Sequence, residues 1–115
     1  MNSRELAAQI SEPMLQKKGN KIIVMDISKL TTVTDFFVIC SATSDTQVKA
    51  ISDFIKDGTK KIDEGPWHNE GYANLSWVLL DFVNVVVHIF LEDTRKFYNL
   101  EGLWADAEIK EVKDE

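Results

Sequence analysis

The chain has 115 residues, of which 44% are hydrophobic, and this size and composition are typical of one domain with a proper core. Its 13 basic and 19 acidic residues give a net charge of −6, which argues against direct nucleic-acid binding and favours a basic protein as partner. No apolar run approaches the roughly 20 residues of a membrane helix. The polar N-terminus, with Glu5 and Glu12, lacks the features of a targeting peptide, so we expect a cytoplasmic protein without membrane contact.

The first half of the chain predicts the order helix, strand, strand, helix. Ser3 is a suitable N-cap for the first helix, and Pro13 predicts a kink or a break within it. The second strand is apolar at nearly every position, as in a strand that is buried on both faces. Ser44 is the expected N-cap of the second helix. The expected ranges are 3–18, 21–27, 36–41 and 45–62.

The second half predicts a polar loop, two adjacent strands and a short helical region. Only Val83 and Asn84 separate the two strands, so direct pairing requires a two-residue hairpin. A β-branched residue is unfavourable at the positive φ of such turns, so we expect a strained or slightly longer turn at Val83. The expected ranges are a loop over 63–76 with a short strand near 67–69, strands over 77–82 and 85–91, and helical pieces over 92–98 and 99–107.

This order of elements indicates an α/β fold, with a mixed sheet of about five strands and helices mainly on one face. Residues 1–107 are expected to form a single domain. The segment 108–115 is highly charged and weakly hydrophobic, so we expect it to be a frayed tail.

Pairing around Val83 and Asn84 divides the hairpin into two faces, because side chains alternate across a sheet. One face is uniformly apolar and is the expected core face beneath the helices. The other, here called the mixed face, carries Trp77, Leu79, Asp81, Val86, His88 and Phe90. A buried carboxylate needs a partner, and Trp is a frequent interface anchor, so we expect this face to be partly accessible and to contact a partner. The alternative is that a terminal helix covers it.

The sequence carries no recognisable catalytic pattern, and we expect no catalytic residue, bound metal or cofactor. Its two histidines, His68 and His88, and its single cysteine, Cys40, lack the spacing of metal ligands. Cys40 lies in an apolar strand and is expected to be a small buried side chain. The turn after residues 36–41 lacks the glycines and lysine of a phosphate loop. Three carboxylates at strand ends leave a magnesium site open as an alternative: Asp26, Asp35 and Asp81.

Three segments together resemble the ribosomal silencing factor family, also called RsfS or Iojap. They are DFFVICSATSDTQVKAI (35–51), WVLLDFVNVVVHIF (77–90) and RKFYNLEGLW (95–104). Their order and spacing follow the family pattern, and the resemblance extends over about residues 6–106. Ala42 and Val83 depart from it, since the family often has glycine at both positions, and both changes alter the local backbone preference.

The resemblance implies a nucleotidyltransferase-like topology in a protein that is not an enzyme. It implies binding to the large ribosomal subunit through ribosomal protein fourteen of that subunit, and steric block of subunit joining when nutrients are scarce. It also implies a homodimer when the protein is free. Together with the face analysis, it implies a partner-binding set of Trp77 and Leu79 as apolar anchors, Asp81 and His88 as polar contacts, and Tyr98 as a flank.

Two alternatives belong to other classes of protein. One is a magnesium-dependent nucleotidyltransferase-like enzyme or nucleotide-binding protein that uses Asp26, Asp35 or Asp81. The other is a dimeric scaffold that makes no contact with the ribosome.

Overall fold

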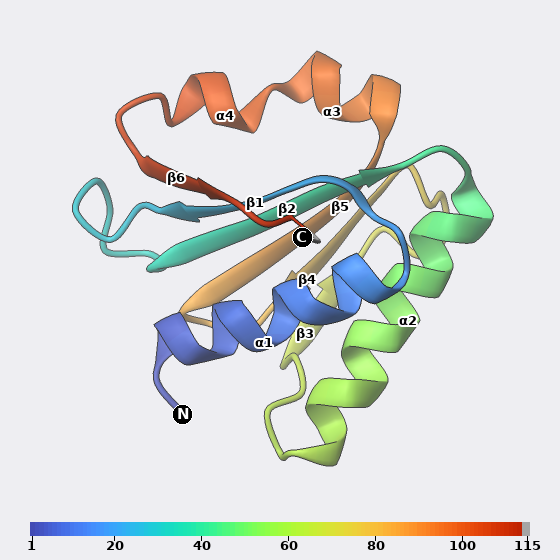
Figure 1. Cartoon of the computed structure of the whole chain (residues 1–115), viewed down its shortest axis with the longest axis horizontal. Coiled ribbons are helices and arrows are strands. Elements are labelled where there is room, and N and C mark those ends of the chain that lie inside the picture. Colours follow the sequence, from blue (N-terminus) through green and yellow to red (C-terminus); the bar gives the residue numbers. More distant parts are fainter. Residues whose placement is uncertain (114–115) are drawn as a thin grey trace.

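The computed structural model describes residues 1–113, whose strands form one mixed sheet of six strands (Figure 1). The strand order is β3-β4-β5-β2-β1-β6. At its centre β2 (Phe36–Ala42) and β5 (Val85–Leu91) run parallel, and the other neighbouring strands are antiparallel. The remaining strands are β1 (Asn20–Asp26), β3 (His68–Glu70), β4 (Trp77–Asp81) and β6 (Glu108–Glu111).

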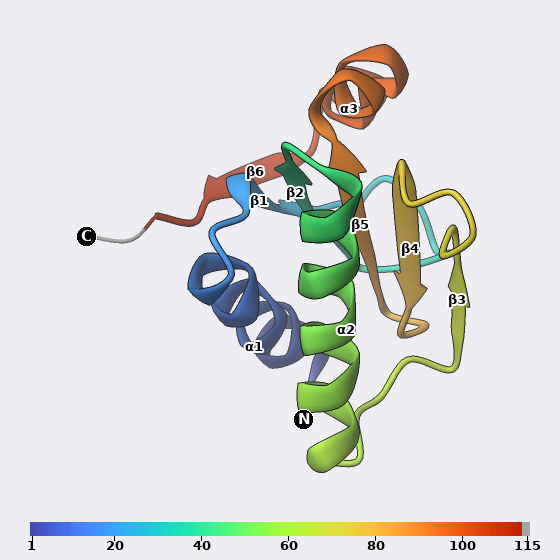
Figure 2. The same cartoon turned by 90° about the vertical axis from the view of Figure 1, so that its right-hand side faces the viewer.

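Two long helices cover one face of the sheet, and two short helices lie on its other side (Figures 1 and 2). The long helices are α1 (Ser3–Gln16) and α2 (Asp45–Lys61); the short ones are α3 (Glu92–Tyr98) and α4 (Leu100–Leu103). Helices therefore lie on both faces, although the larger pair shares one of them. Within residues 1–113, no helix is long and apolar enough to cross a membrane.

The main core lies between the sheet and the pair α1–α2. The predicted core face of the hairpin is confirmed, because five of its side chains are buried there: Val78, Leu80, Val85, Val87 and Ile89. Cys40 is buried in the same cluster, as predicted, and desolvation raises the pKa of its thiol to about 12. A thiol with such a pKa stays protonated and unreactive at neutral pH.

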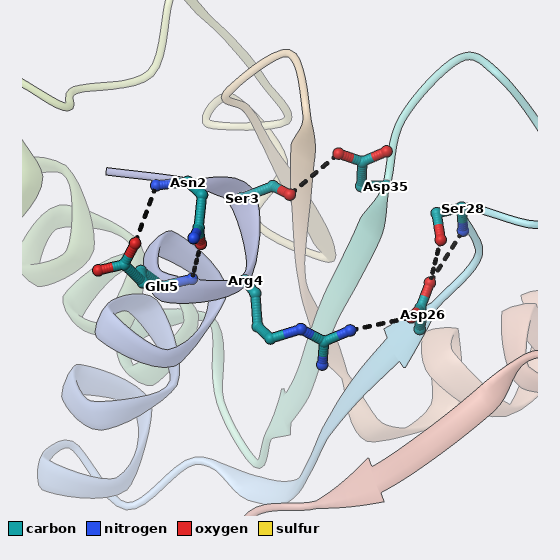
Figure 3. A network of polar contacts seen from close by, with 7 residues as sticks. All are labelled: Asn2, Ser3, Arg4, Glu5, Asp26, Ser28 and Asp35. Atoms are coloured by element: carbon teal, nitrogen blue, oxygen red, sulfur yellow. Dashed lines mark hydrogen bonds and ion pairs between the residues drawn. The ribbon is translucent and has the colours of Figure 1, made fainter.

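α1 runs through Pro13 as one helix, so the predicted break is absent. Pro13 lies close to the C-terminal end of the helix and removes only one backbone bond, while Ile10 and Met14 are buried on either side of it. The N-cap is Asn2 and not Ser3: Asn2 Oδ1 accepts a hydrogen bond from the Glu5 amide at 2.8 Å, and the Glu5 side chain accepts from the Asn2 amide (Figure 3).

The start of α1 is tied to the end of β1 and to the loop that follows it (Figure 3). Ser3 Oγ donates to Asp35 Oδ2 at 2.9 Å, and Arg4 Nη2 contacts Asp26 Oδ2 at 3.3 Å. Asp26 Oδ1 also accepts from the Ser28 hydroxyl and amide, at 2.6 and 3.0 Å. These Ser28 bonds, followed by the charge of Arg4, hold the pKa of Asp26 below its usual value.

The sheet has six strands, one more than the approximate count from sequence, because residues 108–111 form β6 and pair antiparallel with β1. The predicted tail is therefore part of the sheet over these residues; residues 114–115 lie outside the described part of the chain. A charged edge strand has a weak sequence signal, because solvent reaches it and charges there limit aggregation. The helical piece expected over 99–107 is also shorter, since α4 covers only Leu100–Leu103. The other elements match their predicted bounds within two residues.

The two-residue turn at Val83-Asn84 is confirmed, and so is its strain. Val83 has a φ of 75°, and the Asn84 amide donates to the Phe82 carbonyl oxygen at 3.0 Å across a tight turn. The Asp81 carboxylate supports the turn, since its Oδ1 accepts from the Val83 amide at 2.8 Å. Val83 is 56% exposed, so packing offsets little of this backbone strain.

Replacing Val83 by glycine is expected to stabilise the protein by about 0.5–1 kcal/mol. The left-handed conformation costs an L-residue roughly 1–2 kcal/mol, and glycine removes this strain. Glycine also has more conformational freedom in the unfolded chain, and this offsets part of the stabilisation. Urea titration of both proteins measures the difference. Val83→Ala is the matched control and should gain much less, because it keeps the Cβ atom. A glycine variant no more stable than the alanine variant would contradict this account of the turn.

Candidate partner-binding surface

The predicted register of the mixed face is confirmed by the pairing of β4 with β5. Trp77 lies opposite Phe90, Leu79 opposite His88 and Asp81 opposite Val86. On the other side of β5, the parallel strand β2 places Phe37 beside Val86 and Ile39 beside His88. The mixed face therefore continues onto β2.

Part of this face is covered by the C-terminal segment of the described chain. Leu100 and Trp104 pack against a second buried cluster on this side of the sheet, which includes Ile39 and Phe90. The alternative in which a terminal helix covers the mixed face is therefore correct for one of its residues, Phe90. Sequence alone could not show this, because the position of α4 over the sheet depends on the backbone at Asn99, a residue with positive φ between α3 and α4.

Apart from the buried His88, the rest of the face stays accessible, and we call it the open corner. It comprises five half-buried residues, Phe37, Trp77, Leu79, Asp81 and Val86, and one residue of α3, Tyr98. The Tyr98 residue, at the end of that helix, is 45% exposed. β3 adds exposed polar residues at its edge, since His68 pairs with Asp81 and Glu70 with Leu79. The open corner thus combines aromatic and aliphatic side chains with an acidic rim.

Trp77 is held in one orientation by three neighbours. Its Nε1 donates to His88 Nδ1 at 3.0 Å. Its ring centroid lies 4.6 Å from that of Tyr98 and 4.9 Å from that of Phe90. The structure therefore brings three of the predicted site residues, Trp77, His88 and Tyr98, into direct contact, and it presents the indole as a preorganised apolar surface.

His88 lies beneath the surface, with only 4% of its area exposed. Because Nδ1 accepts from Trp77, the neutral ring carries its proton on Nε2. Nε2 is buried and has no hydrogen-bond partner among the described residues; the Phe37 ring lies 4.7 Å away, centroid to centroid, in an edge arrangement. Desolvation lowers the pKa of His88 to about 3, so the ring is neutral at physiological pH. Its visible role is to orient Trp77, and a direct contact with a partner stays a prediction.

The carboxylates considered as magnesium ligands serve separate local structures. Asp81 caps the hairpin turn, Asp35 accepts from Ser3, and Asp26 accepts from Ser28 and contacts Arg4. Residues 1–113 contain no group of three His, Cys, Asp or Glu side chains placed to hold a metal ion. The structure therefore adds nothing in favour of the nucleotidyltransferase alternative.

Arg95 fixes α3 to the sheet, and the sequence did not reveal this role. Its side chain is buried, and Nη1 donates to the Asn20 carbonyl oxygen and to Ser41 Oγ, both at 3.3 Å. Its Nε and Nη2 lie 3.3 Å from Glu101 Oε2 on α4. One guanidinium therefore joins β1, β2, α3 and α4, and it holds Tyr98 against Trp77.

Two aromatic residues were absent from the predicted set: one lies in the open corner and the other lies next to it. Phe37 could have been placed on the same face as Ile39 by alternation along its strand, but its position beside the hairpin depends on the parallel pairing of β2 with β5. Phe97 follows no strand pattern; it is 81% exposed on α3, and its ring lies 5.1 Å from that of Tyr98. The sequence signal that could have identified Phe97 is the presence of an aromatic residue on the polar side of a short helix.

Comparison with known proteins supports a single family. The model of the family described as "Ribosomal silencing factor during starvation" matches residues 1–115. The chain is 36% identical to the ribosomal silencing factor RsfS of Bacillus subtilis over 112 residues, covering 97% of this chain and 95% of that protein. It is 38% identical to the chloroplastic protein Iojap of Zea mays over 101 residues, covering 88% of this chain and 44% of that longer protein.

Solved structures agree with this assignment. A crystal structure of a protein from Chromobacterium violaceum superimposes with a TM-score of 0.88 at 30% identity, covering 99% of this chain and 95% of the other. A crystal structure from Bacillus halodurans superimposes with a TM-score of 0.81 at 32% identity, covering 97% and 100%. On the full-length family match and these relatives, the chain belongs to the ribosomal silencing factor (RsfS) family.

Proposed function

We propose that this protein silences ribosomes: it docks on the large ribosomal subunit and sterically blocks joining of the small subunit, and so represses translation when nutrients are scarce. It acts in the cytoplasm, as a binding module and not as an enzyme. The observation that carries the proposal is the open corner, a preorganised aromatic and acidic surface on a sheet face that α1 and α2 leave uncovered. Relatives across most of the chain are named ribosomal silencing factors.

The proposed docking partner is a basic ribosomal protein, ribosomal protein fourteen of the large subunit. The chain carries a net charge of −6, and this charge is unevenly distributed: residues 62–109, which include β3, β4, β5, α3 and α4, contain nine acidic and two basic residues. Such a surface repels ribosomal RNA and attracts a basic protein, with faster encounter at low salt. Little direct contact with nucleic acid is therefore expected.

Within the open corner, Trp77 and Leu79 are the proposed apolar contacts, with Asp81 and Tyr98 beside them. His88 supports Trp77 from below. We also propose that the free protein is a homodimer that covers this surface, because exposed apolar area of this kind favours association in water. Neither role requires a cofactor or a metal.

Replacing Leu79 by arginine is expected to weaken binding to purified large subunits by at least about tenfold. The change removes an apolar contact and places a positive charge opposite a basic partner. Leu79 is half-buried on β4, and the long arginine chain can extend to solvent, so the fold should persist. Co-sedimentation with large subunits measures the affinity, and light scattering of subunit mixtures measures the block of joining.

Ala50→Arg is the matched control, because it adds the same charge at an exposed position of α2, on the opposite layer. It should bind and block joining like the wild type. If the wild type stays in the supernatant, the silencing proposal fails. If Leu79→Arg pellets as well as Ala50→Arg, the function survives but the assignment of the open corner fails.

A further inference from the structure

Aromatic contacts continue beyond the open corner, from Tyr98 to Phe97 on α3. Trp77 contacts Tyr98, with ring centroids 4.6 Å apart, and Tyr98 contacts Phe97 at 5.1 Å in an edge arrangement. Exposure rises along this chain of rings: Trp77 is half-buried, Tyr98 is 45% exposed and Phe97 is 81% exposed. Phe97 is therefore the part of this aromatic series that has most area to bury when a partner arrives.

Phe97 is presented by a rigid element despite its exposure. α3 is fixed by the buried Arg95 side chain to Asn20 and Ser41, and its C-terminal end is closed by Asn99, whose amide donates to the Arg95 carbonyl oxygen at 2.9 Å. An aromatic residue on a fixed helix loses little conformational freedom on binding. The fold therefore holds a large apolar side chain in water without using it in the core.

The surroundings of Phe97 indicate what kind of partner would cover it. Asp93 lies four residues earlier, and both side chains are exposed, so a carboxylate lies one helical turn from the ring on the same face of α3. Segment 62–109 has two basic residues. Arg95 is buried and paired with Glu101, so Lys96 is the one basic side chain of this segment that is exposed. This combination suits an apolar pocket rimmed by lysine or arginine, and it disfavours a phosphate backbone.

We propose that Phe97 is a principal anchor of the docking surface and that it inserts into an apolar pocket on a basic protein, with Asp93 pairing at the rim. The proposal rests on the function proposed above and changes its emphasis. Trp77 and His88 form the preorganised support behind Tyr98, whereas Phe97 makes the deepest contact. The binding surface accordingly spans the open corner and the outer face of α3.

The first test measures the dissociation constant of purified large subunits with Phe97→Ala, Phe97→Tyr and the wild type. Phe97→Ala should bind about tenfold or more weakly, because it removes the buried apolar area. Phe97→Tyr, which keeps the ring, should bind within a few-fold of the wild type. Phe54→Ala on α2 is the control: it removes the same side chain from a 38% exposed site on the opposite layer and should leave binding unchanged.

The second test separates a basic protein from RNA as the occupant. Asp93→Lys should weaken binding if the rim of the pocket is basic, and should strengthen it if Phe97 stacks on ribosomal RNA. If the wild type binds and Phe97→Ala binds equally well, the anchor role of Phe97 is overturned, but the proposed function is not. Stronger binding by Asp93→Lys overturns the basic-protein partner. A wild type that does not bind overturns the proposed function together with this inference.

Discussion

Lowering the pH from about 6.5 to about 4.5 is expected to reduce the free energy of unfolding by about 2 kcal/mol, through His88 alone. Burial lowers the pKa of this ring from 6.5 to about 3, so the folded protein keeps it neutral throughout this range. The unfolded chain takes up a proton as the pH falls below 6.5. The unfolded state therefore binds more protons, and stability falls with decreasing pH until the folded ring is itself protonated near pH 3.

Urea titrations at a series of pH values measure this slope. The chosen range lies above the ordinary aspartate pKa of 3.8, so it avoids Asp26 and Asp53, whose lowered pKa values add a further loss of stability only at lower pH. His88→Gln should remove most of the slope, because the amide does not titrate and can still accept from Trp77. His68→Gln, at an exposed site, should keep it. A wild type with no slope, or an unchanged slope in His88→Gln, would show that the ring is not buried as described.

Replacing Arg95 by alanine is expected to destabilise the protein by about 2–3 kcal/mol. Breaking a buried ion pair typically costs roughly 3–5 kcal/mol, and the 32% exposure of the Glu101 side chain reduces that figure. The change leaves Glu101 without its guanidinium and removes the donor to Asn20 and Ser41. Thermal unfolding should shift downward by about 10 °C, and amide exchange should accelerate in α3.

Two further variants show whether the loss comes from the buried charge. Lys96→Ala, at the neighbouring exposed position, should change stability by less than about 0.5 kcal/mol. Arg95→Met combined with Glu101→Leu should be more stable than Arg95→Ala, because no unpaired charge remains. A double variant as unstable as the single one would mean that the Asn20 and Ser41 contacts, and not the ion pair, hold α3 in place.

Local patterns were sufficient for most of the secondary structure. Period-two alternation in 77–91 placed Val78 and Leu80 in the core, and Ser44 was identified as a cap from its residue type alone. The strain at Val83 also followed from sequence, since a β-branched residue occupied a turn that favours positive φ. Patterns failed where a distant partner decides the outcome: β6 exists because the open edge of β1 offers hydrogen bonds, not because residues 108–111 have a strand composition.

For the candidate site, too, the sequence predicted the local features and missed those that depend on distant contacts. From sequence alone came the register of the hairpin, the single face shared by Trp77, Leu79 and Asp81, the acidic charge that favours a basic partner, and the motifs of the silencing factor family. These are properties of neighbouring residues, of composition or of ordered motifs, and they do not depend on how the chain returns on itself.

The tertiary structure alone decided which part of the mixed face stays open. α4 and Trp104 cover Phe90 and the neighbouring β1–β2 part of the sheet, while Arg95 holds α3 so that Tyr98 flanks Trp77 and Phe97 faces solvent. It also turned His88 from an apparent surface contact into a neutral support beneath the indole. Burial depends on contacts between segments far apart in the chain, such as Ser41 with Arg95, and no local pattern of residues specifies those contacts.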